Sequence, residues 1–361
     1  MILCVSRAPA GSSGAKPALV VNGRFLRARP TGLHRVGRAL LDALLAGGLS
    51  AEVIAPRGVS DPRVDRTIPS WSGRSGDHAF EQFALPAIAG SRPVLSLTNT
   101  GPILARRGWL AVHDLGVHRR PEWYAKDMRL YGAIVLAAAR RAERVITFTD
   151  AVAGELAEAG VDRRRVIVVR ESVDPAFRPA SAERVSEVTR RLGLADQPFA
   201  LMVGWAHPRK DLATAVAAHR QAREKRPHRL VLIGEGHGTF AGVQVPDDDS
   251  VVRVGHVDDD ELVALLTGAA ALLYPSRYEG FGLPPLESWA CGTPALVADI
   301  PALRESTQGR GELIQNGDVE GWTAALLRAL SGELTVPSLP EWSWDDAARQ
   351  LREVLPAQVW R

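Results

Sequence analysis

From Tyr274 to Glu305 the chain reads YPSRYEGFGLPPLESWACGTPALVADIPALRE. An apolar run, Ala271 to Tyr274, leads into this stretch and predicts a buried strand. A polar loop with Gly280 and Gly282 follows, and two adjacent prolines mark the first turn of a predicted helix, where proline is tolerated. Glycines ahead of a helix leave backbone N–H groups free at the positive end of the helix dipole. We therefore predict a strand–loop–helix unit with a binding site for an anion.

The same alternation of apolar strands and helices extends over most of the chain. Runs such as Ala18 to Asn22 and Phe199 to Gly204 predict strands, and apolar residues at helical spacing follow them. This pattern predicts an α/β fold with mostly parallel sheets covered by helices on both faces. The pattern breaks from Asp174 to Pro198, where prolines bracket a polar helix, so we place a domain junction there.

We expect four parts along the chain. Residues 1–17 form a loose N-terminal extension, residues 18–178 and 179–340 form two Rossmann-like domains, and residues 341–361 form a C-terminal helix. This last helix is predicted to follow Ser343, because serine caps helix N-termini and Asp345 and Asp346 suit the first turn.

The composition is that of a globular protein: 46% of the 361 residues are hydrophobic and 24% are charged. No apolar run is long enough to span a bilayer, and the run Ile2 to Val5 is too short for a signal peptide, so we expect a cytoplasmic protein. Cys4 and Cys291 are not expected to form a disulfide. A net charge of +3 is too small to indicate a nucleic-acid partner.

Several arginines gather near the start of the first domain. They are Arg24, Arg27, Arg29, Arg35 and Arg38. Such a patch either contacts phosphates or an anionic membrane surface, or is simply a solvated surface, and the sequence leaves these interpretations open.

Two carboxylates frame the glycine loop, Glu279 within it and Glu287 one turn into the helix. Either one alone is explained by helix capping, but the pair together with the glycines and prolines is not. The pattern resembles the signature of family 4 retaining glycosyltransferases, the sucrose-synthase and mannosyltransferase type. That signature has two glutamates separated by seven residues around Gly-Phe-Gly, with Gly-Thr-Pro downstream. The chain has Gly280-Phe281-Gly282 and Gly292-Thr293-Pro294 at these places.

The resemblance implies a role for each matching residue. Glu287 would accept hydrogen bonds from the donor ribose, since a carboxylate offers two acceptor oxygens to two vicinal hydroxyls. Glu279 would lie beside the transferred sugar, and backbone N–H groups from Phe281 to Leu283 would hold the diphosphate. The candidate donor-binding residues are Gly32, Gly204, Val257, Ser276, Gly280, Phe281, Gly282, Leu283 and Glu287.

A second motif, VGWAHPRK, runs from Val203 to Lys210 directly after a predicted strand. Arg209 and Lys210 resemble the diphosphate-binding pair of the family, which would stabilise negative charge as it develops on the leaving group. Without that context, an Arg-Lys pair is an exposed basic turn. Trp205 stands where several relatives carry another arginine, so the diphosphate meets one cation fewer here or takes one from elsewhere.

The first domain carries looser matches. His113 and Asp114 resemble the His-Asp pair at the acceptor side of the cleft, where the histidine contacts the transferred sugar and its carbonyl oxygen helps to stabilise a sugar cation. A lone histidine at a strand end is otherwise a polar cap. Gly32 matches the glycine that lets the backbone approach the donor phosphate. The candidate catalytic residues are His113, Arg209, Lys210 and Glu279, and the acceptor-side candidates are Arg35, Asn99 and Asp114.

Segments of the first domain also look like the branch that builds bacterial surface polysaccharides with mannose or rhamnose. They are Glu81-Gln82, Asn99-Thr100-Gly101-Pro102 and Pro121-Glu122-Trp123-Tyr124. The resemblance runs from about Val20 to Leu355 and is stronger in the second domain.

Two other patterns are weaker. The run IGEGHG from Ile233 to Gly238 lacks the third glycine or alanine of a dinucleotide fingerprint, because Thr239 stands there. The acidic runs 247–249 and 258–260 favour a solvated turn and a helix cap over a metal site. We find no His/Cys cluster with metal-ligand spacing.

The family resemblance implies the GT-B fold, an acceptor-binding and a nucleotide-sugar-binding Rossmann-like domain that face each other across a cleft, with the C-terminal helix packing back towards the first domain. It implies retaining transfer of a hexose, with GDP-linked mannose or rhamnose types favoured, to a glycan or lipid-linked acceptor. No cofactor and no essential metal are expected, and the protein would be cytoplasmic with or without peripheral contact at the inner membrane face. A nucleotide-sugar epimerase and a non-catalytic donor-binding protein on the same scaffold are the alternatives.

Overall fold

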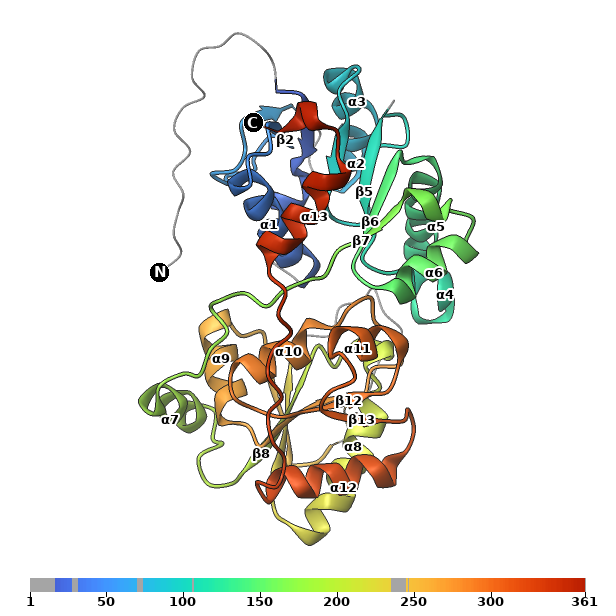
Figure 1. Ribbon diagram of the computed structural model, residues 1–361. Helices are drawn as coiled ribbons and strands as arrows, with labels where there is room; N and C mark the ends of the chain where they lie inside the picture. The colour runs from blue at the N-terminus through green and yellow to red at the C-terminus, as the bar shows by residue number, and fades with distance from the viewer. Residues whose placement is uncertain are drawn as a thin grey trace.

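The computed structural model describes residues 17–27, 32–69, 74–105, 107–234, 245 and 247–360, which form two α/β domains (Figure 1). Predictions that fall on other residues lie outside the described part of the chain. These are the extension at residues 1–17 except Pro17, with Cys4, and also Arg29 and the fingerprint-like run beyond Gly234.

The first domain is built on a parallel sheet that has seven strands among the described residues, in the order β3-β2-β1-β4-β5-β6-β7. The strands are β1 (Leu19–Asn22), β2 (Ala51–Pro56), β3 (Arg66–Ile68), β4 (Val94–Ser96), β5 (Gly108–Ala111), β6 (Arg144–Thr147) and β7 (Val166–Val168). The helices of this domain are α1 (Gly32–Ala46), α2 (Arg74–Ala79), the π-helix η2 (Phe80–Ala84), α3 (Leu85–Ala89), α4 (Gly116–Arg119), α5 (Lys126–Arg141) and α6 (Asp150–Glu158).

The second domain has a parallel sheet with six strands in the described residues, in the order β10-β9-β8-β11-β12-β13. The strands are β8 (Phe199–Val203), β9 (Arg229–Ile233), β10 (Val251–Gly255), β11 (Ala271–Tyr274), β12 (Ala295–Ala298) and β13 (Glu312–Ile314). The helices are α7 (Ala182–Arg191), α8 (Leu212–Lys225), α9 (Asp259–Gly268), α10 (Leu283–Ala290), α11 (Pro301–Ser306) and α12 (Val319–Leu330), and α13 (Trp344–Val354) follows them in the chain.

The central strands are mostly apolar because helices cover both faces of each sheet. All four residues of β11 are buried, and so are all four of β1. The strand order reverses between β1 and β4 in the first sheet, and between β8 and β11 in the second. In open parallel sheets, ligands bind at the carboxyl ends of the strands at such a switch point. Both domains therefore offer a binding edge.

The last helix, α13, lies on the first domain rather than on the second. It packs against α1, and Arg352 donates a hydrogen bond to the Gly47 carbonyl oxygen at 2.9 Å (Figure 1). Ser343 is the N-cap, as predicted, and the structure adds a full capping box: Ser343 accepts from the backbone N–H of Asp346, and the Asp346 carboxylate accepts from the N–H of Ser343.

The chain therefore crosses between the domains twice, once after β7 and once before α13. The two crossings lie side by side, because Ser172 Oγ in the first donates a hydrogen bond to the Trp342 carbonyl oxygen in the second at 3.2 Å. Figure 1 shows the green and the dark red segments running between the domains.

Candidate active site

A buried ion cluster lies at the carboxyl ends of the second sheet. Lys210 ends the short 3₁₀ helix Pro208–Lys210 after β8, and its Nζ lies 2.7 Å from Glu279 Oε1. Lys210 Nζ also donates to the Tyr274 hydroxyl at 2.7 Å, at the end of β11. Arg209 Nη1 lies 3.5 Å from Glu279 Oε2 and 3.5 Å from Asp114 Oδ2 of the first domain. Two loops of the second domain and one of the first thus meet at one point.

The charges in this cluster are set by burial and by the ion pairs. Burial alone would raise the pKa of Glu279, but Arg209 and Lys210 lower it to about 2. Burial lowers the pKa of Lys210 to about 8 against the attraction of Glu279. Burial would also lower the pKa of Arg209, but Glu279 and Asp114 raise it well above its ordinary value. Near neutral pH, the two cations are therefore paired with the buried carboxylate of Glu279 and with the half-buried Asp114.

The glycine loop predicted from the sequence lies beside these cations. Gly282 is the N-cap of α10 and has a φ of 92°, and a side chain here would collide with Leu303. A Cβ atom on Gly280 would overlap the His113 carbonyl oxygen and lie 2.9 Å from its carbonyl carbon. Gly280 is therefore the point at which the second domain approaches the first most tightly among the glycines described, and it places the α10 N-terminus at the boundary.

Glu287 of α10 is buried and linked to the first domain. Its Oε1 lies 3.2 Å from Arg35 Nη2 of α1, and Arg35 Nη1 lies 2.8 Å from Asp259 at the start of α9. Burial raises the pKa of Glu287 to about 7, with Arg35 opposing that shift and Asp259 adding to it. The carboxylate that the resemblance assigns to a ribose thus holds an arginine of the opposite domain.

His113 follows β5 and is held on every side. Its backbone N–H donates to Asn99 Oδ1 at 2.7 Å, and Asn99 adopts a left-handed φ of 47°. Its ring packs against Phe148 with centroids 4.5 Å apart. Nε2 lies 2.9 Å from the Leu97 carbonyl oxygen, and Nδ1 lies 3.4 Å from Glu171 Oε1. Both ring nitrogens therefore face protein groups, and the carbonyl oxygen of His113 faces Gly280.

The other predicted residues take several positions. Gly204 has a φ of 71° and lies next to Lys210, and Ser276 is fully buried and adds to the lowering of the Glu279 pKa. Phe281 is buried, and Leu283 is the first residue of α10. Gly32 begins α1, with nothing within 4 Å of a Cβ atom built on it. Val257 is half-buried after β10.

Sequence reasoning missed several residues that hold the domains together. Tyr278 donates to Glu155 Oε2 at 2.7 Å and accepts from the backbone N–H of Leu115 at 2.9 Å. Glu305 accepts from the backbone N–H of Asp150 and lies 2.7 Å from Arg170 Nη1. Their partners are far away in sequence, so no local spacing indicates them. The one sequence feature that could have indicated Tyr278 is its position directly before Glu279.

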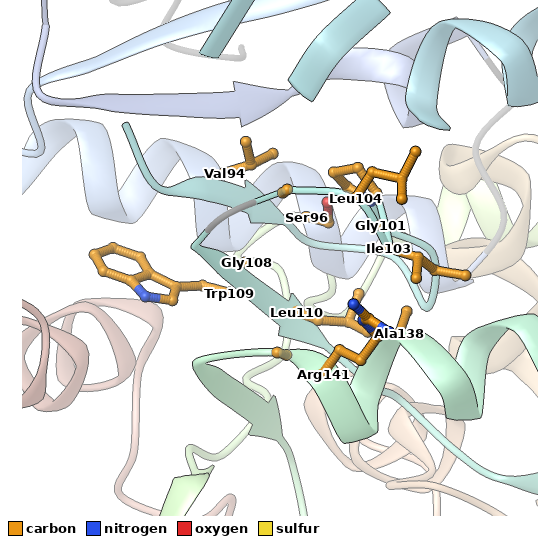
Figure 2. Close-up of a pocket in the computed structure, with 13 residues that line it drawn as sticks. Val94, Ser96, Gly101, Ile103, Leu104, Gly108, Trp109, Leu110, Ala138 and Arg141 are labelled. Atoms are coloured by element: carbon orange, nitrogen blue, oxygen red, sulfur yellow. The ribbon is translucent and has the colours of Figure 1, made fainter. Parts of the chain in front are cut away.

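Two pockets lie in the first domain. The larger, of about 320 Å³, lies where the connection between β4 and β5 forms no helix in its described residues. Figure 2 shows that it is lined by mainly apolar side chains such as Ile103 and Leu110, with Arg141 the labelled charged residue. It contains none of the predicted site residues.

The second pocket, of about 240 Å³, lies beside the cleft. It is lined by Arg24, Phe25, Arg27, Leu33, His34, Asp77, Thr98 and Tyr131. Burial lowers the pKa of His34 to about 4, and the charges of Arg38, Arg24 and His113 add to the shift, which places this pocket close to His113.

The second domain is similar to known glycosyltransferases. Residues 197–332 match the family described as Glycosyl transferases group 1. The O-antigen chain mannosyltransferase B of Escherichia coli is 26% identical over 241 residues, which cover 64% of this chain and 63% of that protein. The D-inositol 3-phosphate glycosyltransferase of Salinispora arenicola is 28% identical over 313 residues, which cover 78% and 66%. The match thus spans less than two thirds of either relative.

Comparison of structures identifies the fold. The structure of Anabaena Alr3699/HepE in complex with UDP and glucose superposes with a TM-score of 0.67 at 15% identity, and the match covers 93% of this chain and 94% of that one. The two facing parallel-sheet domains are therefore the GT-B fold, as the sequence predicted.

Two kinds of feature are absent from the described residues, a membrane-spanning helix and a metal-ligand cluster. No helix in the described ranges is both long enough and apolar enough to cross a membrane. Nor do the residues placed by the structure bring three or more His, Cys, Asp or Glu side chains together as metal ligands.

Proposed function

We propose that the protein is a retaining glycosyltransferase that moves a hexose, of mannose or rhamnose type, from a nucleoside diphosphate sugar to a glycan or lipid-linked acceptor. The setting would be polysaccharide or glycoconjugate biosynthesis in the cytoplasm, at the inner face of the membrane. The match to the glycosyltransferase group 1 family and the O-antigen mannosyltransferase relative support the reaction and the sugar.

One observation carries this proposal: the buried cations Arg209 and Lys210 beside the glycine loop and the N-terminus of α10. A diphosphate placed there would meet two cations and the free N–H groups of a helix start. These cations would also stabilise the charge that develops on the leaving phosphate, so no essential metal is required of the site. The bound UDP of the Anabaena structure is in keeping with such a ligand.

The second pocket is the proposed site of the acceptor sugar. Aromatic rings of Phe25 and Tyr131 offer flat apolar faces, and the ion pair of Arg27 with Asp77 offers donors and acceptors for hydroxyl groups. It lies next to His113, which the resemblance places beside the transferred sugar.

Retention of configuration follows from the proposed mechanism. The acceptor hydroxyl would attack on the face that the nucleotide leaves, and the leaving phosphate would take its proton. Glu279 is a poor proton donor near neutral pH because its pKa is about 2, and Lys210 and Arg209 occupy its oxygens. We therefore assign Glu279 to holding Lys210 in place rather than to proton transfer.

Thermal-shift measurements with UDP, GDP, dTDP and ADP, each with and without EDTA, test the donor site. One nucleotide should raise Tm, and the shift should survive EDTA, because a ligand that binds only the folded state stabilises it. Lys210→Met should abolish the shift, whereas Lys225→Met, on the exposed end of α8, should keep it. A site that recognises none of the four nucleotides would refute the proposal.

The reaction is tested with the matching nucleotide sugar and a panel of mannosyl and rhamnosyl acceptors. Nucleotide should be released only when an acceptor is present, and the anomeric configuration of the product should match that of the donor. Release of a free epimer without acceptor would identify an epimerase, and binding without turnover would identify a donor-binding protein.

A further inference from the structure

A buried carboxylate lies directly behind His113. Glu171 follows β7, at the start of the first crossing between the domains, and is 5% exposed. Within the described part of the chain, its carboxylate has one ion-pair partner, His113, whose Nδ1 lies 3.4 Å from Glu171 Oε1. Neither the family signature nor the strand pattern indicates this residue.

The surroundings of the ring determine where its protons are. Nε2 lies 2.9 Å from the Leu97 carbonyl oxygen, and a carbonyl only accepts, so Nε2 carries a proton. One more proton can then lie between Nδ1 and Glu171 Oε1. That proton lies either on Nδ1, giving an ion pair, or on Oε1, giving two neutral groups. The net charge of the His113–Glu171 pair is zero in both cases.

Loss of this proton would leave a negative charge in an already acidic part of the cleft. Burial raises the pKa of Glu171, His113 opposes that shift, and Glu279 and Asp114 add to it. Glu171 in turn helps to raise the pKa of Glu287. The ionisable groups that face the pair from the elements around it are Asp114, Glu279, Glu287, Arg209 and, beside His113, His34.

We propose that Glu171 is a positioning residue for His113 and that the two side chains share one exchangeable proton, whose loss makes the pair negative and weakens the binding of a nucleoside diphosphate. The proposal rests on the function proposed above, since it needs a diphosphate in the cleft. Protonated, the pair keeps the ring fixed between Leu97 O and Glu171. When the pair is deprotonated, a lone pair of Nδ1 faces the Glu171 carboxylate. The pair then carries one negative charge, which repels the anionic diphosphate.

The experiment compares the pH dependence of nucleotide affinity in matched variants. Calorimetry with UDP and GDP, between about pH 5 and 8, is applied to the wild type and to Glu171→Gln. The amide keeps a hydrogen bond to Nδ1 and cannot ionise. Glu143→Gln is the control, because it makes the same change at an ion pair with Arg107, next to the amino ends of β5 and β6.

The wild-type Kd should rise with pH more steeply than the Kd of Glu171→Gln, by up to about tenfold per pH unit where the pair titrates. Ionisation of the nucleotide affects both proteins equally, so the difference between the two slopes reports the charge of Glu171 together with its effect on neighbouring groups such as Glu287. Glu143→Gln should follow the wild type. Parallel curves for the wild type and Glu171→Gln would overturn the inference while nucleotide binding itself stands. Absence of nucleotide binding at every pH would remove the proposed function and this inference together.

A measurement on the unmodified chain covers the case in which Glu171→Gln does not fold. Histidine labelled with ¹⁵N gives the ring nitrogen signals, and His113→Asn assigns that of His113 by its loss. The Nε2 proton should persist over the whole range while the Nδ1 signal titrates. A His113 ring that loses its Nε2 proton, or whose Nδ1 signal stays constant over the whole pH range, would refute the shared proton.

Discussion

Gly280→Ala should separate the two domains without altering the nucleotide site of the second. The added Cβ would overlap the His113 carbonyl oxygen, and it would lie 2.9 Å from the carbonyl carbon and 3.0 Å from Asp114 Cβ. Non-bonded carbons prefer about 3.5 to 4.0 Å, so the loops must move apart by roughly 1 Å. All three contacts are with backbone or Cβ atoms, which cannot rotate away. The backbone of Gly280 is not in the left-handed region, so the cost is steric alone.

The size of the effect follows from this displacement. A misplacement of about 1 Å between reacting groups can lower a rate by a factor of about 100. We therefore expect kcat/KM of Gly280→Ala to fall roughly 100-fold. Nucleotide affinity should stay close to that of the wild type, because Arg209 and Lys210 keep their contacts with Glu279 inside the second domain.

The assay combines initial rates of sugar transfer with calorimetry of nucleotide binding and a thermal melt. Gly154→Ala is the matched control: it makes the same change on the exposed side of α6, where nothing lies within 4 Å of the new Cβ. Alanine should stabilise that helix slightly. Wild-type transfer by Gly280→Ala would mean that the approach of Gly280 to His113 plays no part in catalysis.

Two further variants test the carboxylate of α10 and the last helix. Glu287→Gln should raise the donor KM more than it changes kcat, since it weakens contacts to a ribose; unchanged donor affinity would contradict that role. The same variant tests pH dependence: because the pKa of Glu287 is raised from 4.5 to about 7 in the folded protein, its ionisation destabilises the wild type as pH rises through that window. The difference in Tm between Glu287→Gln and the wild type should therefore increase as the pH rises from 4.5 to about 7. Ser343→Ala removes the capping box of α13 and should cost about 1 kcal/mol in that helix, measured by hydrogen exchange of α13 amides; unchanged exchange would show that the cap is not needed.

The sequence predicted the parts of the fold that have strong local signals. The strand Ala271–Tyr274, the helix that begins beside the two prolines, and the helix capped by Ser343 all occur in the structure. None of the elements from α11 to α12 is predicted from the sequence. There β13 is only three residues long with two of them half-buried, so it shows neither a full apolar run nor an alternation.

The candidate site likewise has some contacts that the sequence motifs indicate and others that they do not. The contact of Lys210 with Glu279 joins two motifs that the sequence singled out, because each follows a strand of the same sheet. Glu171 and Tyr274 belong to the site through partners more than fifty residues away along the chain, and a lone polar residue at a strand end carries no signal of its own. The link between Arg35 and Glu287 joins two candidates, but only the docking of the domains reveals it.

The paired crossings constrain how the two domains can move. Two domains joined by a single linker can rotate relative to each other in many directions. Two adjacent linkers restrict these rotations. With Ser172 bonded to Trp342, the segments after β7 and before α13 form a hinge line. An opening of the domains would then turn about this line and would separate the loops around Gly280 and His113.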